Sequence, residues 1–567
     1  MGIIARQSIK ATIATYFGVA VGFFTTFFVL TRFLTAEEIG LTRVLIDAAT
    51  LFVSLAQLGT SSSIIRFFPY FRQKEQTKGG TGADFSTAGE TPMEVRSPGR
   101  TIEVHSMEVR HRDRNSFTAG ETPASPVEPM VRPGDRTSFN TDHGFFFWTV
   151  VIPLVGFLVF ALLYWACRVP LGQWFGEKSP LFLEYYYFVL PLAFFLLYQT
   201  IFETNCNVLM RIVVPRMVRE VVVRLGMLAC YLLYAFRVLS LDGFVVAVCA
   251  NYGIAALINL GYLIALGQIS FRPDWQFLRA NIPLVKNYVR YSSFVFVSAL
   301  AAALGPTLSS FFITAKMGLD YTGIFAIATY IAVIVSIPYR SLTAIASPQL
   351  ARATKEQNHA EAQTLIHQVS SNLLLIGGLL FFLIWCNIDL IFHILPNGET
   401  YAVARNVVFI LSLTQLIVAT CTISLTTISF SRYYAFSLLF SLILTITSLC
   451  LNNYLIPLYG MEGAAVSTLL SNVLYFALAL LVLRFACHQR LLNGNALKTI
   501  VLLLLLFALN ALWLHFLPTR NIWWSSIART VLLGGSGVAV AYMLRLSPEL
   551  SKIGDTLLNF LKRKGKE

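Results

Sequence analysis

The sequence contains little charge. Asp, Glu, Lys and Arg make up 13% of its 567 residues, about half of the roughly 25% that is typical of soluble globular proteins. Hydrophobic residues make up 56%, and the mean hydropathy is +0.66. So few charged side chains cannot cover the surface of a water-soluble body of this size. The composition therefore excludes a soluble multidomain enzyme and predicts an all-α polytopic membrane protein.

Motifs of metal binding and catalysis are also missing. The eight cysteines lie in or beside apolar runs without C-x-x-C spacing, which is typical of small core residues and not of a metal site or a disulfide framework. The sequence has no H-E-x-x-H zinc motif and no G-x-x-x-x-G-K-[ST] phosphate loop. We therefore expect no cofactor, no metal, no catalytic residues and no ATP hydrolysis, so the protein is not expected to be an enzyme.

Apolar runs long enough to cross a bilayer recur along the chain, since a span needs roughly 20 residues. We predict fourteen spans, an even number that places both termini on the same side of the membrane. Their approximate ranges are 9–31, 43–65, 144–167, 184–207, 217–237, 243–268, 289–314, 320–342, 366–388, 403–426, 433–456, 461–484, 497–517 and 524–545.

Basic residues decide the expected orientation. With a cytoplasmic N-terminus, only nine of the 43 Lys and Arg residues fall on the outside, namely Arg32, Arg43, Arg168, Lys178, Arg237, Lys316, Arg405, Arg520 and Arg529. This bias follows the positive-inside rule. It predicts a multi-pass membrane protein with both termini cytoplasmic; the resemblance described below implies that this membrane is the bacterial inner membrane. Because the basic residues are spread over many loops, we expect no nucleic-acid partner.

Residues 73–143 differ from the rest of the chain. They hold eleven acidic and nine basic residues, and they repeat TAGETP (87–92 and 118–123) and MEVR (93–96 and 107–110). Low hydrophobicity and repeats of this kind predict a disordered segment, here a cytoplasmic insertion. Either it has no dedicated role or it binds a partner; both interpretations stay open.

The remaining chain divides into two comparable halves. Gly40 of LTAEEIGL corresponds to Gly323 of MGLDYTGI, and LDGFVVAVCANYG (241–253) resembles MEGAAVSTLLSNV (461–473) at a similar spacing. This predicts a duplicated six-helix unit with a pseudo-twofold axis along the membrane normal. The expected units are an N-terminal lobe (1–72 and 144–270), an interfacial linker helix (271–288), a C-terminal lobe (289–484), two appended spans (497–545) and an amphipathic basic tail (546–567).

Two stretches resemble a known family. TRFLTAEEIGLTRVLIDAATLFVSLAQLGTSSSIIRFFPYF (31–71) and NNYLIPLYGMEGAAVSTLLSNVLY (452–475) are similar to bacterial polysaccharide, or O-antigen, flippases of the Wzx type. Their superfamily also includes MATE multidrug exporters and lipid II flippases. The resemblance implies two six-helix lobes arranged as a V around a central cavity. It also implies transfer of undecaprenyl-diphosphate-linked oligosaccharide across the membrane.

Span two carries a polar stripe. At about 100° per residue its polar side chains lie within roughly 40° of one line; they are Arg43, Asp47, Thr50, Ser54, Gln57 and Ser61. A charge facing lipid costs at least about 2.5–3.5 kcal/mol, so the stripe either lines the cavity or forms a polar seam between helices. Arg43 and Asp47, one turn apart, are also able to pair.

Span four offers Gln199, Glu203 and Asn207 on one helix face. An intramembrane carboxylate is a candidate functional group by default. Glu203 either binds a coupling proton or pairs with an arginine of a neighbouring helix, such as Arg224. Gln415 of span ten is a further candidate lining residue.

Four arginines near the expected cytoplasmic ends of spans have two interpretations. They are snorkelling anchors, or they contact a diphosphate, for which the planar guanidinium has suitable geometry. These residues are Arg66, Arg224, Arg290 and Arg340.

The function expected from these features is flipping of a lipid-linked oligosaccharide by alternating access, for surface polysaccharide or lipopolysaccharide synthesis. Its expected partners are the lipid-linked oligosaccharide, membrane lipids and, as a further candidate, a polysaccharide polymerase or ligase. One alternative is a MATE-like ion-coupled multidrug exporter. Another is a membrane polymerase or ligase, although such enzymes usually have one large periplasmic loop, whereas the longest expected outside loop here is about 389–402.

Overall fold

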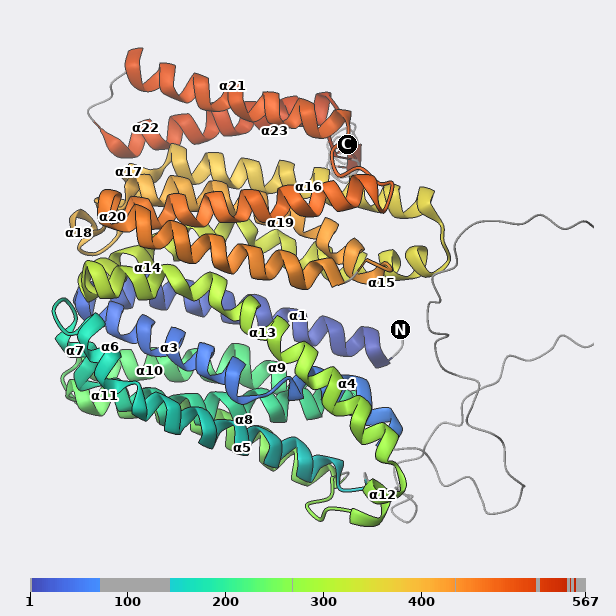
Figure 1. Cartoon of the computed structure of the whole chain (residues 1–567). Helices are drawn as coiled ribbons and strands as arrows, with labels where there is room; N and C mark the ends of the chain where they lie inside the picture. Colours follow the sequence, from blue (N-terminus) through green and yellow to red (C-terminus); the bar gives the residue numbers. More distant parts are fainter. Residues whose placement is uncertain are drawn as a thin grey trace, which may run out of the picture.

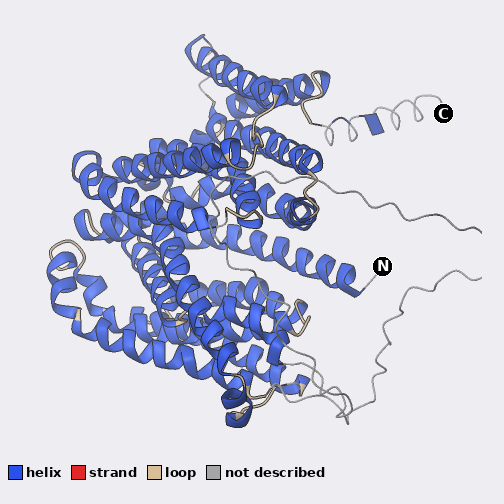
Figure 2. Ribbon diagram, turned by 45° about the vertical axis from the view of Figure 1, so that its right-hand side comes forward, coloured by secondary structure: helices blue, strands red, loops and turns tan. Residues whose placement is uncertain are grey.

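The computed structural model describes residues 3–71, 143–267, 269–433, 435–516, 521–547, 551 and 555–556. Within these ranges the chain forms helices joined by turns and loops, without strands (Figure 2). Eleven of the described helices are long and apolar enough to cross a membrane. The prediction of an all-α polytopic membrane protein is therefore confirmed, whereas the number of fourteen spans stays a prediction.

The first lobe occupies the lower part of Figure 1. Three of its spans contain a stretch of π or 3-10 helix, labelled η. Its elements are α1 (Ile3–Phe24), η1 (Thr25–Leu30), α2 (Thr31–Phe33), α3 (Ala36–Ala56), α4 (Thr60–Phe71), α5 (Phe145–Ala166), α6 (Arg168–Phe175), α7 (Pro180–Glu184), η2 (Tyr186–Phe188), α8 (Val189–Val208), α9 (Val213–Met217), η3 (Val218–Val222), α10 (Val223–Ala235) and α11 (Leu241–Leu266).

The second lobe and a C-terminal pair of helices form the upper part of Figure 1. The long helix α13 runs obliquely from the lower to the upper group of helices, and it packs against α3 and α20. The elements are α12 (Trp275–Ala280), α13 (Ile282–Lys316), α14 (Leu319–Val333), η4 (Ile334–Ser336), α15 (Ile337–Lys355), α16 (His359–Cys386), α17 (Ile388–Ile394), α18 (Gly398–Ala402), α19 (Arg405–Phe430), α20 (Ala435–Phe485), α21 (Gly494–Phe516), α22 (Ile522–Arg529), η5 (Thr530–Gly534) and α23 (Gly535–Met543).

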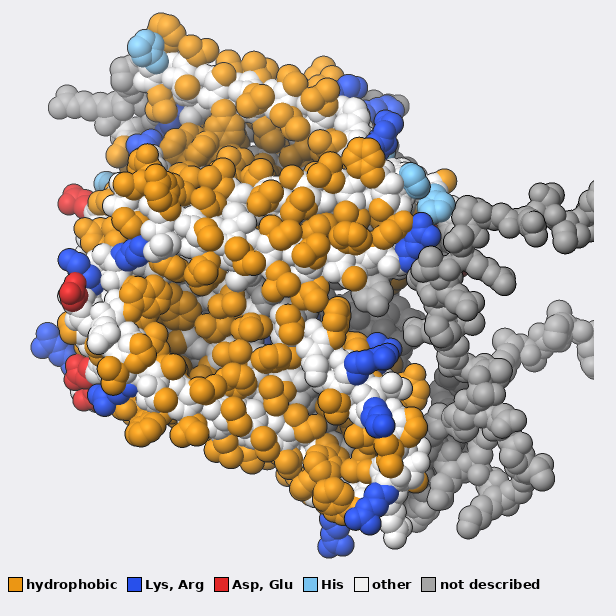
Figure 3. Space-filling view, viewed as in Figure 1, with side chains coloured by type: hydrophobic (Ala, Val, Ile, Leu, Met, Phe, Trp, Pro, Cys, Tyr) orange, Lys and Arg blue, Asp and Glu red, His pale blue; other side chains and the backbone are white. Residues whose placement is uncertain are grey.

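The ends of the helices form two faces. The terminal face, on the right of Figure 1, carries the start of α1, the end of α23 and α12, and the opposite face carries α6, α7, α17 and α18. Figure 3 shows hydrophobic side chains between these faces, with charged side chains gathered towards the two ends. In this view the acidic side chains lie at the opposite face together with several Lys, Arg and His side chains, whereas the charged side chains visible at the terminal face are Lys and Arg, with His beside them. Such an apolar band is expected of a protein surrounded by lipid.

The helix α20 contains two antiparallel segments. Gly460 has non-helical angles (φ 58°, ψ −134°) and separates them. Ser467, which follows this turn, donates a hydrogen bond to the carbonyl of Ser448, which precedes it. A Cβ on Gly463 would fall onto the carbonyl oxygen of Leu455. The glycines and alanines of the IPLYG-x-x-GAA stretch therefore allow the two segments to approach closely.

We expect Gly463→Val to destabilise the protein by about 1–3 kcal/mol, because the added side chain overpacks this hairpin. The measurement is the thermal unfolding midpoint of the purified protein in detergent. The control is Gly261→Val, since Gly261 lies within α11 and a Cβ there meets no atom within 4 Å. Equal midpoints for the two variants would contradict the expectation.

Three regions depart from the expected organisation or lie outside the described residues. Span two is not one helix: Leu58 and Gly59 have positive φ (48° and 75°), so the chain breaks between α3 and α4. The stretch 271–288 is also not one helix, because Asn281 leaves helical geometry and a new helix, α13, starts at Ile282 with Pro283 in its first turn. The predicted insertion 73–143, except His143, and most of the predicted tail 546–567 lie outside the described residues.

The linker is attached to the start of α5. Asp274 accepts a hydrogen bond from the Phe277 amide at the start of α12 (2.9 Å), and its carboxylate lies 3.0 Å from His143 Nδ1. The His143 ring also stacks on Phe277, with 4.3 Å between centroids. The Phe277 amide and then His143 lower the pKa of the Asp274 carboxyl, because both favour its ionised form.

Candidate functional site

The two lobes meet near the opposite face through their equivalent helices. Helix α3 of the first lobe packs on α14 of the second. A Cβ on Gly40 would fall onto the carbonyl of Leu319, and a Cβ on Gly323 would fall onto the carbonyl of Ala36. Because each glycine meets the residue four positions before the other, the contact is reciprocal, as in a twofold dimer interface. The sequence repeat pairs these same glycines.

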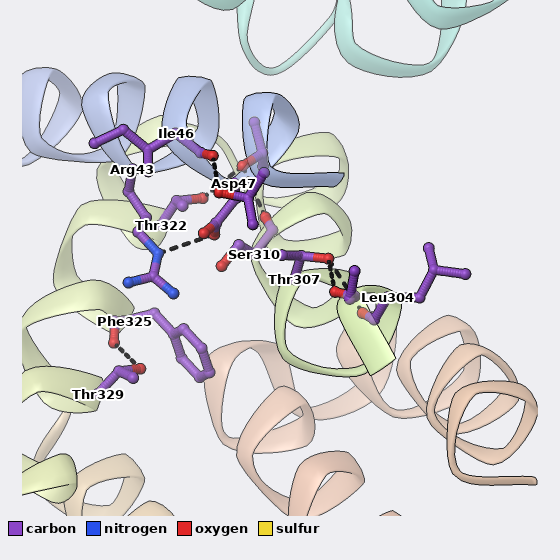
Figure 4. Close-up of polar contacts among 12 residues, drawn as sticks. Arg43, Ile46, Asp47, Leu304, Thr307, Ser310, Thr322, Phe325 and Thr329 are labelled. Carbon is purple, nitrogen blue, oxygen red and sulfur yellow. Dashed lines mark hydrogen bonds and ion pairs between the residues drawn. The ribbon is translucent and has the colours of Figure 1, made fainter. Parts of the chain in front are cut away.

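One turn deeper, a partly buried ion pair lies at the same junction. Arg43 Nε donates to Asp47 Oδ2 at 2.9 Å, and the relative exposures of the two side chains are 22% and 9%. From the second lobe, Ser310 of α13 lies beside Asp47, and the ring centre of Tyr330 of α14 lies 5.8 Å from the Arg43 guanidinium. Figure 4 shows Arg43 and Asp47 pointing from α3 towards α13 and α14. The predicted Arg43–Asp47 pair is therefore present, and it bridges the lobes.

The rest of the predicted stripe is interrupted. Thr50 is exposed and Ser54 half-buried on α3. Gln57 ends α3 and accepts a hydrogen bond from Ser61 of α4 (2.9 Å). Because of the break at Leu58 and Gly59, Ser61 does not continue the line of α3. The first two residues of the stripe, Arg43 and Asp47, thus lie in a seam between the lobes. Lining of a cavity by the others, Thr50, Ser54, Gln57 and Ser61, stays a prediction.

A second charged group joins three helices of the first lobe, towards the terminal face. Glu203 of α8 pairs with Arg219 of η3 (3.0 Å), which also lies 3.4 Å from Glu220. Glu220 pairs in turn with Arg224 of α10 (2.9 Å), and Arg224 donates to the carbonyl of Gly18 in α1 (2.7 Å). We call these five residues the charge network.

The charge network corrects one expectation. Glu203 does form an ion pair, but its partner is Arg219, while Arg224 binds Glu220. Sequence reasoning did not single out Arg219 or Glu220. The i, i+4 spacing of Glu220 and Arg224 in the sequence was a signal for their pairing. Arg219 had no such signal, because it lies in η3, a π-helical stretch; such stretches are common at functional sites. The irregular turn sets the direction of Arg219, which a regular helix does not predict.

The other predicted site residues are dispersed. Gln199 is buried in α8, and its Oε1 has no hydrogen-bond partner among the described residues. Asn207 and Gln415 are half-buried in α8 and α19. Arg66 and Arg290 are exposed on α4 and α13. The side chain of Arg340 lies outside the described part of the chain.

Arg66 has a defined neighbour. Its guanidinium lies 4.5 Å from the ring centre of Tyr291 of α13. Nearby, Ser63 of α4 and Ser292 of α13 share a hydrogen bond of 2.7 Å. Helices α4 and α13 thus meet beside these exposed arginines.

No known protein-family profile matches the chain, and no curated protein is similar to it in sequence. Solved structures do match. The lipid II flippase MurJ in an inward closed conformation gives a TM-score of 0.64 at 10% identity, over 94% of this chain and 99% of that one. This chain has the fold of a membrane transporter.

Two multidrug transporters have the same fold. A point mutant of the Vibrio cholerae MATE transporter VcmN gives a TM-score of 0.53 at 15% identity, over 86% of this chain and 97% of that one. An inward-facing multidrug resistance MATE transporter of the MOP superfamily gives 0.52 at 12% identity, over 82% and 93%. The predicted MATE-like architecture is confirmed.

Proposed function

We propose that this protein flips undecaprenyl-diphosphate-linked oligosaccharide across the bacterial inner membrane by alternating access, for surface polysaccharide or lipopolysaccharide synthesis. In this proposal the terminal face is cytoplasmic, the protein carries no enzymatic activity, and membrane lipids surround it. The sugar diphosphate crosses between the lobes while its lipid tail remains in the bilayer.

The observation that carries the proposal is the sign of the accessible charge at the terminal face. On α4, η3 and the start of α13 the accessible charged side chains are basic: Arg66, Lys286 and Arg290 are exposed, and Arg219 is 44% exposed. The nearby carboxylates of Glu203 and Glu220 are buried and paired. Accessible guanidinium groups favour an anionic diphosphate, whereas an exporter of cationic drugs would need accessible carboxylates.

The test uses the purified protein in liposomes that contain a fluorescent undecaprenyl-diphosphate oligosaccharide. We expect protein-dependent transfer to the other leaflet, and a decrease of about tenfold when Arg66 and Arg290 are both changed to Gln. Arg352→Gln is the control, because Arg352 is a strongly exposed arginine of α15 with its own partner, Glu356. The control should keep the parent rate.

Two results would overturn the proposal. Uptake of a cationic dye without lipid transfer would favour a MATE-like exporter. Polymerisation or transfer of the oligosaccharide would indicate a polymerase or ligase. In the proposed role, a separate polymerase or ligase consumes the flipped lipid, and co-purification of such an enzyme would identify that partner.

A further inference from the structure

The C-terminal helix pair at the top of Figure 1 contains a buried arginine. Arg529 ends α22, about 10 Å along the helix axis from Ile522, and its relative exposure is 3%. Its Nε donates to the carbonyl of Ser525 (3.3 Å), and its Nη2 donates to Ser526 Oγ (3.4 Å). These contacts use two of the five N–H donors of a guanidinium, and no other described residue accepts a hydrogen bond from it.

The charge of Arg529 has no acidic partner in its surroundings. Residues 463–548 contain neither Asp nor Glu, so neither α21 nor α22 offers a carboxylate. On α17, which packs against α22, Asp389 is already paired with Arg405 (2.9 Å). Within the described ranges no ion pair includes Arg529. A buried charge without compensation is strongly destabilising, so this arginine requires a negative charge from elsewhere.

Helix α21 carries two more N–H groups without acceptors. Asn510 is 2% exposed; its Oδ1 accepts a hydrogen bond from the Cys386 thiol (3.4 Å), but its amide nitrogen donates to none of the described residues. One turn further along, the indole nitrogen of Trp513 is buried and likewise has no partner in the described part of the chain. Residues three apart lie on the same face of a helix, so both groups lie on the side of α21 that contacts α16.

The end of α16 brings these groups close to Arg529. Asn387, which follows Cys386, exchanges two hydrogen bonds with Thr530 (2.8 and 3.1 Å), and Thr530 follows Arg529. The Arg529 charge also acts on the Cys386 thiol. Apolar side chains of α16, α21 and η5 form a hydrophobic cluster around them, namely Leu375, Phe382, Leu502, Leu506 and Leu533. Water is therefore a poor substitute for the missing acceptors.

We propose that Arg529 is the centre of an anion-binding site, at which Asn510 and Trp513 supply further N–H donors. The ligand is an anion because every group without a partner is a donor except for the positive charge itself, and charge-assisted hydrogen bonds are the strongest of their kind. Two sources share this chemistry: chloride from the solution at the opposite face, and the phosphate group of a surrounding phospholipid. The bound anion compensates the buried charge and holds α22 and η5 against α16. The site is independent of the transported molecule.

The experiment compares hydrogen exchange of the α22 and η5 amides in chloride and in gluconate, a bulky anion, at equal ionic strength. The full chain is purified in detergent without added phospholipid, and chloride is titrated against gluconate. At about ten times the dissociation constant that the titration gives, exchange should be about tenfold slower than in gluconate, because the anion must leave before these helices open.

A second arm distinguishes the two sources of the anion. Phosphatidylglycerol is added to the protein in gluconate. Slower exchange in chloride alone identifies a site for the free ion, whereas slower exchange only after addition of the lipid identifies a site for a phospholipid phosphate. Either result supports the proposal, provided that it depends on Arg529.

Two variants and a control test this dependence. Arg529→Met keeps a long side chain in the hydrophobic cluster and should abolish the response to chloride and to lipid. Asn510→Leu should raise the anion concentration at half effect about tenfold, because the anion loses one hydrogen bond. The control is Arg405→Gln, which removes an arginine already paired with Asp389 and should keep the parental response.

Equal exchange rates of the parent protein in chloride, gluconate and phosphatidylglycerol overturn the proposal, and so does a response that persists in Arg529→Met. If Arg529→Met does not fold, Asn510→Leu decides, since an unchanged concentration at half effect then overturns it. Oligosaccharide transfer is measured separately in the liposome assay, so failure of the anion site leaves the proposed function standing, and failure of transfer leaves the anion site standing.

Discussion

Arg43→Gln is expected to lower the rate of lipid transfer at least tenfold and to destabilise the protein by about 3–5 kcal/mol. The physical reason is that Asp47 remains in the junction with Ser310 but without its cation, and removing one partner of a buried ion pair leaves an uncompensated charge. Since Asp47 is only 9% exposed, water replaces the guanidinium only in part. Thermal unfolding in detergent measures the stability, and the liposome assay measures transfer.

The double variant Arg43→Gln/Asp47→Asn separates stability from transport. It removes both charges, so the unfolding midpoint should recover most of the loss, while transfer stays low if Arg43 itself contacts the substrate. The control is Arg405→Gln. Arg405 forms an ion pair of the same length with Asp389 (2.9 Å), but their side chains are 43% and 39% exposed, and such pairs contribute about 0–1 kcal/mol. A normal transfer rate in the double variant would contradict substrate contact by Arg43.

Glu220→Gln is expected to have a similarly large effect on stability. Glu220 is bound to both Arg219 and Arg224, and its side chain is 7% exposed. Its loss leaves Arg224 with the carbonyl of Gly18 and Arg219 with Glu203 alone. We expect a loss of about 3–5 kcal/mol and faster hydrogen exchange in α1, because the network holds this helix against η3.

A matched pair on the surface provides the control for Glu220. Arg352 and Glu356 have the same i, i+4 spacing and a similar length (2.8 Å), but they are 77% and 49% exposed. Glu356→Gln should therefore change the stability by less than about 0.5 kcal/mol. Similar midpoints for Glu220→Gln and Glu356→Gln would indicate that the charge network does not stabilise the first lobe.

Local sequence patterns were sufficient to predict the helices and the ion pair between Arg43 and Asp47. A span depends mainly on its own hydrophobicity and length, so α5, α11 and α21 begin and end close to the predicted spans. Arg43 and Asp47 lie one turn apart on the same helix, and their pairing needs no other element. The division of α20 at Gly460 was also predicted, because the apolar runs end on either side of it.

Pairing between helices was not predictable in the same way. The partner of Glu203 depends on the rotation of α8 against η3, and a π-helical turn changes that rotation. The break at Leu58 and Gly59 occurs within an apolar run, where hydropathy has no signal for it. The contact of Asp47 with Ser310 likewise joins helices that are far apart in sequence.

The sequence by itself determined that this is a helical membrane protein built from two related halves, and it marked Gly40 and Gly323 as equivalent. Only the tertiary structure decided that these glycines touch, each against the backbone four residues before the other. Composition and periodicity are properties of one segment, whereas the docking of the halves is a property of two surfaces. A repeat indicates which residues are equivalent, and packing alone decides which of them come together.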